Sequence, residues 1–401
     1  MSVRIFSSKL WQIYFRIKTY KQHIQNIHKD KIVRNGIIAN EHSHGYGVFD
    51  DNLKFVKASA QKRGKSFQLI PKISRKNIEY IDKDVVFLGG ILNHFGDFLV
   101  NNLVRTHCLL DKKYSACDIV FVNDKDIAKI PSYVYTFLEL LGVSKDRIII
   151  LEKTTQFKRV FVPDQGWRFP VCTSNKCEKT FNAMVKNLGK TTLTKYEKIY
   201  LSRDALQERR THGEKYISNI FRKNGFKIIY PETLPLKKQI DLVSHCRVLA
   251  GCAGTALHLA LFMKPGGCVI QIKRNSRLKD NAPMQYIINK TKKLDSVFIS
   301  GSIEKRSTIH CTYAPQIIGL NKYMRDFFNK YNYKYDKKSP DIDAKTLNEY
   351  NIDLINYSNS HGNETLYILK RKFIKLSACF IPGRVRRARY RKWVKSLLKV
   401  D

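Results

Sequence analysis

The stretch from Lys198 to Gln271 decides the fold of this chain, and it reads KIYLSRDALQERRTHGEKYISNIFRKNGFKIIYPETLPLKKQIDLVSHCRVLAGCAGTALHLALFMKPGGCVIQ. The short apolar runs KIYLSR, FKIIY, VLAG and CVIQ predict strands. Between them we expect a helix over Glu214 to Asn224 closed by Gly225, a turn and helix over PETLPLKKQIDLVSHC, and a loop entering a helix at CAGTALHLALFM. Strands that alternate with helices of about ten residues predict a parallel sheet with crossover helices on its faces.

The carboxyl ends of these strands carry the polar residues that such a sheet uses for ligands. Ser202 and Arg203 follow the first strand, Glu232 follows the second, and the run from Gly251 to Thr255 follows the third. A Ser, an Arg, a Glu and a glycine-containing turn at a helix start predict a nucleotide and phosphate site.

The length, composition and net charge of the chain limit the classes of protein to which it can belong. The 401 residues are 43% hydrophobic, which suffices for two ordinary domains with cores and excludes a disordered chain. The net charge of +39, from 73 Lys and Arg against 34 Asp and Glu, makes a polyanionic partner the first expectation, whether nucleic acid, anionic lipid or acidic glycan.

The ends of the chain are basic. Residues 1 to about 40 predict one or two helices with Leu10, Ile13, Tyr14 and Ile17 on one face, packed on the main body or contacting a membrane. Residues 370–401 hold twelve Lys or Arg and one acid, interleaved with apolar residues such as Trp393, which predicts an amphipathic surface-binding element or a C-terminal helix packed on the first domain.

No apolar run approaches the ~18 residues of a membrane span, and the N-terminus lacks the pattern of a secretory signal. We therefore expect a cytoplasmic protein, peripheral at the inner face of the membrane through its basic tail. The nine cysteines are odd in number and lie mostly in apolar runs, which predicts buried thiols in a reducing compartment.

The first half repeats the alternating pattern from Asp84 onward, with VVFLGG, CDIVFV and RIIILE as strands and helices between them. The predicted organisation is a basic helical and irregular segment (1–80), an N-terminal Rossmann-like acceptor domain (81–160), a linker and helix (161–190), a C-terminal Rossmann-like nucleotide-sugar domain (191–305), an irregular and helical region (306–369) and a polybasic amphipathic tail (370–401).

The central stretch resembles glycosyltransferase family 61, the capsular-polysaccharide type. The resemblance rests on Tyr200, Ser202, Arg203, Arg209, Arg210, Glu214, Gly225, Phe226, Pro231, Glu232, Gln239, the run Gly254 to His258, Phe262, Pro265 and Gly266. A second segment, GILNHFGDFLVNNLVR, keeps Asn93, Gly96, Phe98, Leu99, Leu103 and Arg105 of a family pattern. It departs at Asp97, where the family usually has His, and at Asn101, where it usually has an acid.

The resemblance implies an α/β fold of the GT-B kind, with two Rossmann-like domains facing across a cleft. It implies inverting transfer of a sugar from a nucleotide-sugar donor to a glycan or lipid-linked glycan, with no cofactor because the nucleotide-sugar is a substrate. The donor-binding residues would be Ser202, Arg203, Arg209, Arg210, Glu232, Gln239, Gly254, Thr255 and His258. Asp97 and then His94 are the candidate catalytic bases, since both begin the first-half helix that faces the cleft.

Each of these residues also has an ordinary structural interpretation. Arg203 could be a surface cation, Thr255 a simple helix cap, Glu232 a solvated turn acid and His258 a core histidine. Gln239 could bond the backbone of a loop.

The pattern also bears on metals. Asp50 and Asp51 are adjacent in an irregular loop, and Asp124 and Asp126 follow a strand of the acceptor half without forming a DxD pair in the expected half. We therefore expect a reaction independent of metal ions.

Three rival functions follow from the same sequence. The charge alone would suit a nucleic-acid-binding protein, but no helix-turn-helix, zinc or RNP-type pattern is present, so no nucleic-acid partner is expected. A Rossmann oxidoreductase would need a glycine fingerprint that the chain lacks. A family member that has lost activity and serves as a scaffold is the third, because of Asp97 and Asn101.

Overall fold

The structure is a computed structural model, and it describes residues 1–24, 30–41, 45–63, 66–67, 70–76, 78–91, 93–114, 116–123, 129–166, 172–189, 195–206, 210–278, 280–303, 314–360 and 384–397. The chain forms two compact units, each assembled from distant segments. Unit 1 comprises Met1–Leu201, Gly225–Gln271 and Leu278–Phe298, and unit 2 comprises Ser202–Asn224, Ile272–Arg277 and Ile299–Asp401. The fold is mixed α/β with parallel strands, as the sequence predicts. The GT-B arrangement and the domain boundaries stay predictions.

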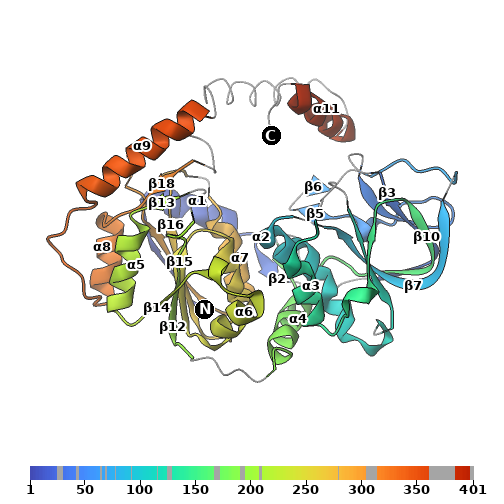
Figure 1. Cartoon of the computed structure of the whole chain (residues 1–401), viewed down its shortest axis with the longest axis horizontal. Helices are drawn as coiled ribbons and strands as arrows, with labels where there is room; N and C mark the ends of the chain where they lie inside the picture. The colour runs from blue at the N-terminus through green and yellow to red at the C-terminus, as the bar shows by residue number, and fades with distance from the viewer. Residues whose placement is uncertain are drawn as a thin grey trace. The chain divides into compact units, whose positions relative to one another are not determined.

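The first sheet of unit 1 has the strand order β4-β3-β10-β7-β8-β9. Figure 1 labels its strands β3, β7 and β10. Its strands are β3 (Lys31–Asn40), β4 (Tyr46–Phe49), β7 (Glu79–Gly90), β8 (Asp118–Val122), β9 (Ile148–Leu151) and β10 (Thr155–Val162). Strands β10, β7, β8 and β9 run parallel, whereas β3 is antiparallel to both of its neighbours. Strand β10 reaches Val162, so the segment expected to be a linker after Arg159 begins inside the sheet.

The connection from β7 to β8 is not the single regular helix that the sequence suggests. It consists of α2 (Phe95–Asp97), a π-helical turn η3 (Phe98–Asn102) and 3₁₀ turns η4 (Leu103–Leu110) and η5 (Lys112–Tyr114). Asn102 donates its side-chain amide to the carbonyl of Gly90 at 2.8 Å, and the guanidinium of Arg105 is buried among backbone carbonyls. These side-chain bonds compete with a regular helical ladder, and such π turns often mark functional sites.

The second sheet has the strand order β1-β17-β16-β15-β12-β14. Its strands are β1 (Val3–Phe6), β12 (Lys198–Leu201), β14 (Lys227–Ile229), β15 (Val248–Cys252), β16 (Cys268–Lys273) and β17 (Asp295–Ser300). Strand β12 is parallel to β14 on one side and to β15 on the other. The direction of winding therefore changes at β12, which is where a doubly wound sheet places its ligand.

The helices of the quoted stretch lie where the sequence predicts them. They are α5 (Glu214–Lys223), η7 (Pro231–Thr233), α6 (Leu236–His245) and η8 (Thr255–Phe262), and α7 (Ala282–Thr291) follows β16. Gly225, at φ +85°, takes the left-handed conformation that ends a helix.

One hydrophobic core joins the helices of both sheets within unit 1. The ring of Phe137 in α3 (Ser132–Glu139) stacks on that of Phe262 in η8 at 6.1 Å, and Phe181 in α4 (Asn175–Lys186) meets Phe262 edge-on at 5.4 Å. This shared core brings the start of the first-sheet connection close to η8.

The N-terminal segment corrects the expectation of helices alone. Among its described residues it contains one helix, α1 (Lys9–Thr19), while β1 joins an edge of the second sheet and β3 lies inside the first. Helix α1 packs through Trp11 and Phe15 rather than through Leu10, Ile13 and Ile17, because the two aromatic rings bury more apolar area.

Unit 2 contains α5, a short parallel pairing of β13 (Thr211–His212) with β18 (Gln316–Ile317), and helices α8 (Lys322–Lys330), α9 (Ala344–Ser360) and α11 (Arg384–Leu397). Phe221 of α5 packs against Phe327, Phe328 and Tyr333 with ring centroids 5.6 to 6.3 Å apart. The region from residue 306 to 369 is thus more helical where described than the sequence suggests. Within the described ranges, every helix is too short or too polar to cross a bilayer.

Candidate active site

Two segments that the sequence singled out meet inside unit 1. A Cβ atom added to Gly96 in α2 would lie 2.4 Å from Cγ2 of Thr255 and 3.2 Å from Cδ2 of His258. The backbone of the first segment therefore touches the side chains that open η8, and only a glycine fits at this point. The structure thus brings the predicted catalytic residues beside two of the predicted donor residues.

His94 and Asp97 lie at the two ends of α2. Nδ1 of His94 accepts a hydrogen bond from the backbone N–H of Asp97 at 3.3 Å, as an N-cap, and lies 3.5 Å from Oδ2 of the same residue. The imidazole is half exposed, whereas the carboxylate is more enclosed. A single nitrogen cannot accept the N–H and donate to the carboxylate at once, so the two contacts of Nδ1 are alternatives.

Asn101 explains how the chain accommodates both departures from the family pattern. Its buried side-chain amide donates to Oδ1 of Asp97 at 3.4 Å. An acid at position 101 would place a second negative charge beside Asp97, whereas an amide donates a hydrogen bond to it. Asp97 and Asn101 are therefore mutually compatible replacements.

The tautomer of neutral His258 is fixed by a chain of buried amides. Nε2 of Gln285 donates to the carbonyl of Leu257 and to Oδ1 of Asn289, so Oε1 of Gln285 is the acceptor that faces Nδ1 of His258 at 3.0 Å. Asn289 in turn donates to Ser296 at 2.9 Å. Nδ1 of His258 must therefore carry the hydrogen, which leaves a lone pair on Nε2.

Burial lowers the pKa of His258 to about 4, although the Gln285 hydrogen bond and the charge of Asp97 act in the opposite direction. The ring is consequently neutral near pH 7. A neutral imidazole with a lone pair on Nε2 can accept a hydrogen bond from a hydroxyl, but it cannot supply positive charge to a phosphate.

Tyr133 completes this cluster and was not found from the sequence. Its ring meets Phe95 at 5.5 Å and Phe98 at 5.4 Å, and burial together with the charge of Asp97 raises the pKa of its hydroxyl to about 12. The phenol therefore stays protonated beside the carboxylate. Neither Tyr133 nor Gln285 stands in a motif, so no signal in a single sequence marks them.

The residues after β12 belong to unit 2, and Glu214 holds their backbone through a hydrogen bond. The side chain of Glu214 is fully buried at the start of α5, and its Oε1 accepts the backbone N–H of Arg203 at 3.1 Å. Ser202 is buried and its Oγ accepts the N–H of Asp204 at 3.2 Å. Glu214 thus fixes the backbone of the turn that carries Arg203.

Arg210 makes ion pairs with α9. Its guanidinium lies 3.9 Å from Glu349 and 3.6 Å from Asp353, which also contacts Nε2 of buried His212 at 2.9 Å. Burial and the charge of Arg210 lower the pKa of His212. Arg209 lies outside the described residues.

The other predicted donor residues separate into exposed and structural ones. Glu232 is exposed in η7. Gln239 donates to the carbonyls of Pro231 and Leu234, both at 2.8 Å, which confirms its loop-bonding interpretation. Gly254 is the N-cap of η8 with an extended backbone.

Among the residues that the structure describes, no group of three or more His, Cys, Asp or Glu side chains is arranged to hold a metal ion. Asp124 and Asp126 lie outside the described residues. Oδ1 of Asp50 accepts the N–H groups of Asn52 and Lys54, so it organises its own loop.

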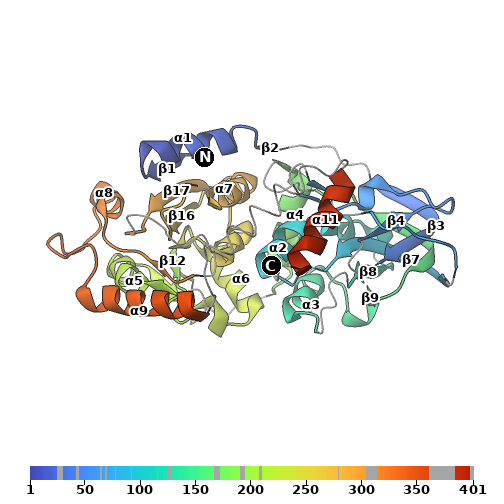
Figure 2. The ribbon, with the colours of Figure 1, turned by 90° about the horizontal axis from the view of Figure 1, so that it is seen from above.

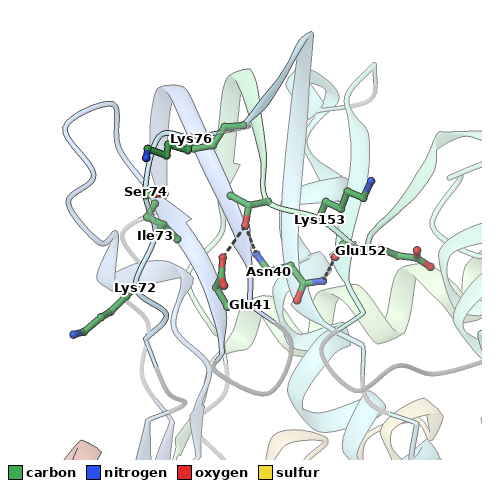
Figure 3. Close-up of a pocket in the computed structure, with 10 residues that line it drawn as sticks. Asn40, Glu41, Lys72, Ile73, Ser74, Lys76, Glu152 and Lys153 are labelled. Atoms are coloured by element: carbon green, nitrogen blue, oxygen red, sulfur yellow. Dashed lines mark hydrogen bonds between the residues drawn. The ribbon is translucent and has the colours of Figure 1, made fainter.

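A polar pocket of about 520 Å³ opens elsewhere on unit 1, at the ends of β3 and β9 (Figure 3). Its wall includes Asn40, whose amide donates to the carbonyl of Glu152 at 3.1 Å, and Glu41, which accepts from Thr154 at 3.4 Å. None of the predicted site residues lines it.

Residues 95–270 match the sequence model of the family Glycosyltransferase 61. Over this segment the chain is similar to Glycosyltransferase 61 proteins, in agreement with the resemblance noted in the sequence. The capsular type stays a prediction. The matched segment includes Gly96, Asp97, Thr255 and His258, so the cluster described above lies within it.

Solved structures of the glycosyltransferase TibC also match. The iron-containing dodecameric TibC of enterotoxigenic E. coli H10407 is 11% identical, with 57% of this chain and 64% of that chain covered and a TM-score of 0.25. Dodecameric heptosyltransferase TibC in complex with ADP-D-β-D-heptose is 10% identical, with coverages of 63% and 77% and a TM-score of 0.23. This chain therefore spans less than two thirds of the first TibC chain. A search of curated proteins found no match.

Proposed function

We propose that the protein is an inverting, metal-independent glycosyltransferase that moves a sugar from a nucleotide-sugar donor to a glycan acceptor in the assembly of a bacterial capsule or other surface polysaccharide. The observation that carries the proposal is the contact of Gly96 with Thr255 and His258. This contact brings a carboxylate, a neutral imidazole and a helix start together within the segment that matches the Glycosyltransferase 61 model.

In the proposed reaction an acceptor hydroxyl attacks the anomeric carbon of the donor in one in-line step. The new bond from the hydroxyl oxygen to carbon forms as the bond from carbon to the diphosphate oxygen breaks, and the electron pair leaves with the nucleoside diphosphate. Asp97 takes the proton of the attacking hydroxyl, because its carboxylate is held by Asn101 and is partly enclosed.

His258 has a different role in this proposal from that of a phosphate ligand. Its lone pair on Nε2 accepts a hydrogen bond from a sugar hydroxyl, because the amide of Gln285 fixes the hydrogen on Nδ1. Such a bond positions the sugar, and a buried acceptor discriminates strongly against sugars that lack the hydroxyl.

Arg203 is the proposed contact for the diphosphate, on a turn that Glu214 holds in place. A planar guanidinium binds two phosphate oxygens at once, which suits a leaving diphosphate better than a point charge does. We further propose the GT-B arrangement and attachment at the inner face of the membrane through the basic tail, of which the structure describes residues 384–397.

One pair of variants tests the assignment of Asp97. Asp97→Asn should lower transfer by at least about a hundredfold, the usual contribution of a general base, while the affinity for the nucleotide-sugar changes little. Arg203→Ala is the matched variant with the reverse effect, since calorimetry should show the loss of nucleoside-diphosphate binding. Normal turnover by Asp97→Asn would remove Asp97 from the mechanism and leave His94 as the candidate base.

A further inference from the structure

We propose that the outer face of α1, formed by Leu10, Ile13, Ile17 and Tyr20, binds the anionic surface of a lipid bilayer. This surface lies outside the candidate active site, and the inference does not depend on the transfer reaction. It is also distinct from the basic tail, because its residues belong to unit 1 whereas the tail belongs to unit 2. All four residues of the stripe lie in the described part of the chain.

Helix α1 is fixed to unit 1 by its opposite face. Phe15 meets the ring of Phe298 at 4.9 Å, and the indole N–H of Trp11 donates to Oδ2 of Asp280 at 2.8 Å. After the helix, Gln22 donates to the carbonyl of Pro283 at 2.7 Å. Figure 2 shows α1 along the side of α7. These contacts set which residues of α1 point outward.

The outward residues are large and apolar. Leu10 is 65% exposed, Ile13 55%, Ile17 67% and Tyr20, at the C-cap, 86%. With about 100° between successive residues of a helix, these positions form one continuous stripe opposite Trp11 and Phe15. A contiguous apolar stripe that is left in water marks an interaction surface.

The charges beside the stripe select the partner. Lys9 and Arg16 border it on one side by the same helical spacing, Lys21 follows the C-terminal end of the helix, and all three are exposed. Residues 1–29 contain six Lys or Arg and no acid. An apolar stripe with cations along one border and at its C-terminal end fits the boundary between anionic headgroups and acyl chains.

Two acids near the N-terminal segment are engaged with groups other than these cations. Asp280 accepts from Trp11 on the packed side, and Asp295 accepts the backbone N–H of Ser2 at 2.5 Å. A second copy of the chain would place cations against cations across a twofold axis, which disfavours self-association through this stripe.

Helix α9 provides a matched control. It also exposes three large apolar residues, Leu347, Ile352 and Ile355, but it carries the acids Glu349 and Asp353. Exposed apolar area is therefore common to both helices, whereas a basic border belongs to α1.

The test is sedimentation of the full chain with phosphatidylcholine vesicles, prepared with and without phosphatidylglycerol. The apolar variant Leu10→Gln/Ile13→Gln/Ile17→Gln should bind the anionic vesicles at least about tenfold more weakly. The α9 variant Leu347→Gln/Ile352→Gln/Ile355→Gln should bind like the wild type. Because all six positions are exposed, thermal unfolding should show that both variants remain folded.

A charge variant separates electrostatic attraction from insertion. Lys9→Gln/Arg16→Gln/Lys21→Gln should lose on the order of a hundredfold in vesicle affinity, since each cation near an anionic leaflet contributes roughly fivefold. Wild-type binding should likewise weaken in about 1 M salt, where charges are screened beyond about 3 Å.

Three results of the vesicle assay would overturn the proposal. They are wild-type protein that does not sediment with anionic vesicles, an apolar variant of α1 that binds as well as the wild type, and equal losses for the α1 and α9 variants. A wild-type dimer that the α1 variant converts to a monomer would also refute it, because a second copy would then cover the stripe.

Discussion

Replacement of Gly96 by alanine tests the contact that assembles the candidate site. The added Cβ would lie 2.4 Å from Cγ2 of Thr255, 2.9 Å from Cβ of Thr255 and 3.2 Å from Cδ2 of His258. Real Cβ atoms do not approach other carbons this closely, so α2 and η8 must move apart. The backbone of Gly96 does not have a positive φ, so the effect of the substitution is steric rather than conformational.

The expected cost is that of overpacking a core by one methyl group, about 1–3 kcal/mol of unfolding free energy. The rate of sugar transfer should fall even under conditions where the Gly96→Ala variant is fully folded. The reason is that Asp97 and His258 lie on the two segments that move apart. Urea unfolding followed by circular dichroism gives the free energy, and release of nucleoside diphosphate gives the activity.

A double-mutant cycle makes the test specific. Thr255→Ser removes the methyl group closest to the new Cβ, so Gly96→Ala should cost less in the Thr255→Ser background, with a coupling of about 0.5 kcal/mol or more. Strictly additive effects, or a Gly96→Ala variant as stable as the wild type, would show that the two segments do not touch as described.

Two further substitutions, a change of pH and added EDTA test separate features of the protein. Arg105→Leu should destabilise the protein by at least about 3 kcal/mol in urea unfolding, because it removes a buried cation that donates to three or more backbone carbonyls. A loss of unfolding free energy within about 0.5 kcal/mol would contradict this role of Arg105. The pKa of His258 is about 4 in the folded protein, below the value of about 6.5 in the unfolded chain. Between these two pH values the unfolded state binds more protons. The stability of the wild type should therefore fall as the pH drops from about 6.5 to 4. His258→Asn should remove on the order of 2–3 kcal/mol of that fall, and an unchanged pH slope would show that the ring titrates normally. Turnover should persist in excess EDTA, and a loss of transfer that Mg²⁺ reverses would reveal a metal site.

The strands and helices of the central stretch were predictable because their signals are local. The apolar runs have strand length, and Gly225 and Pro265 punctuate the elements between them. The meeting of Gly96 with Thr255 was not predictable in the same way, since it depends on a core shared by helices of two sheets. The family pattern indicated that both segments matter, but not that they touch.

Other features depend on tertiary partners that a single sequence does not reveal. Gln285 carries no motif, although it fixes the hydrogen on His258. In α1 the spacing of apolar residues predicted a helix, but the buried face proved to be that of Trp11 and Phe15. Strand β1 pairs at an edge of the second sheet although most of that sheet comes from far along the chain.

The central claim is best tested by incubating the full chain with a panel of nucleotide-sugars and a surface-glycan acceptor in the presence of EDTA, and then determining the anomeric configuration of the product by NMR. The proposed mechanism predicts that at least one donor is consumed, that the new linkage is inverted relative to the donor, and that Asp97→Asn forms it at least about a hundredfold more slowly. A retained configuration, or a failure of every nucleotide-sugar to be consumed with or without added metal, would contradict it.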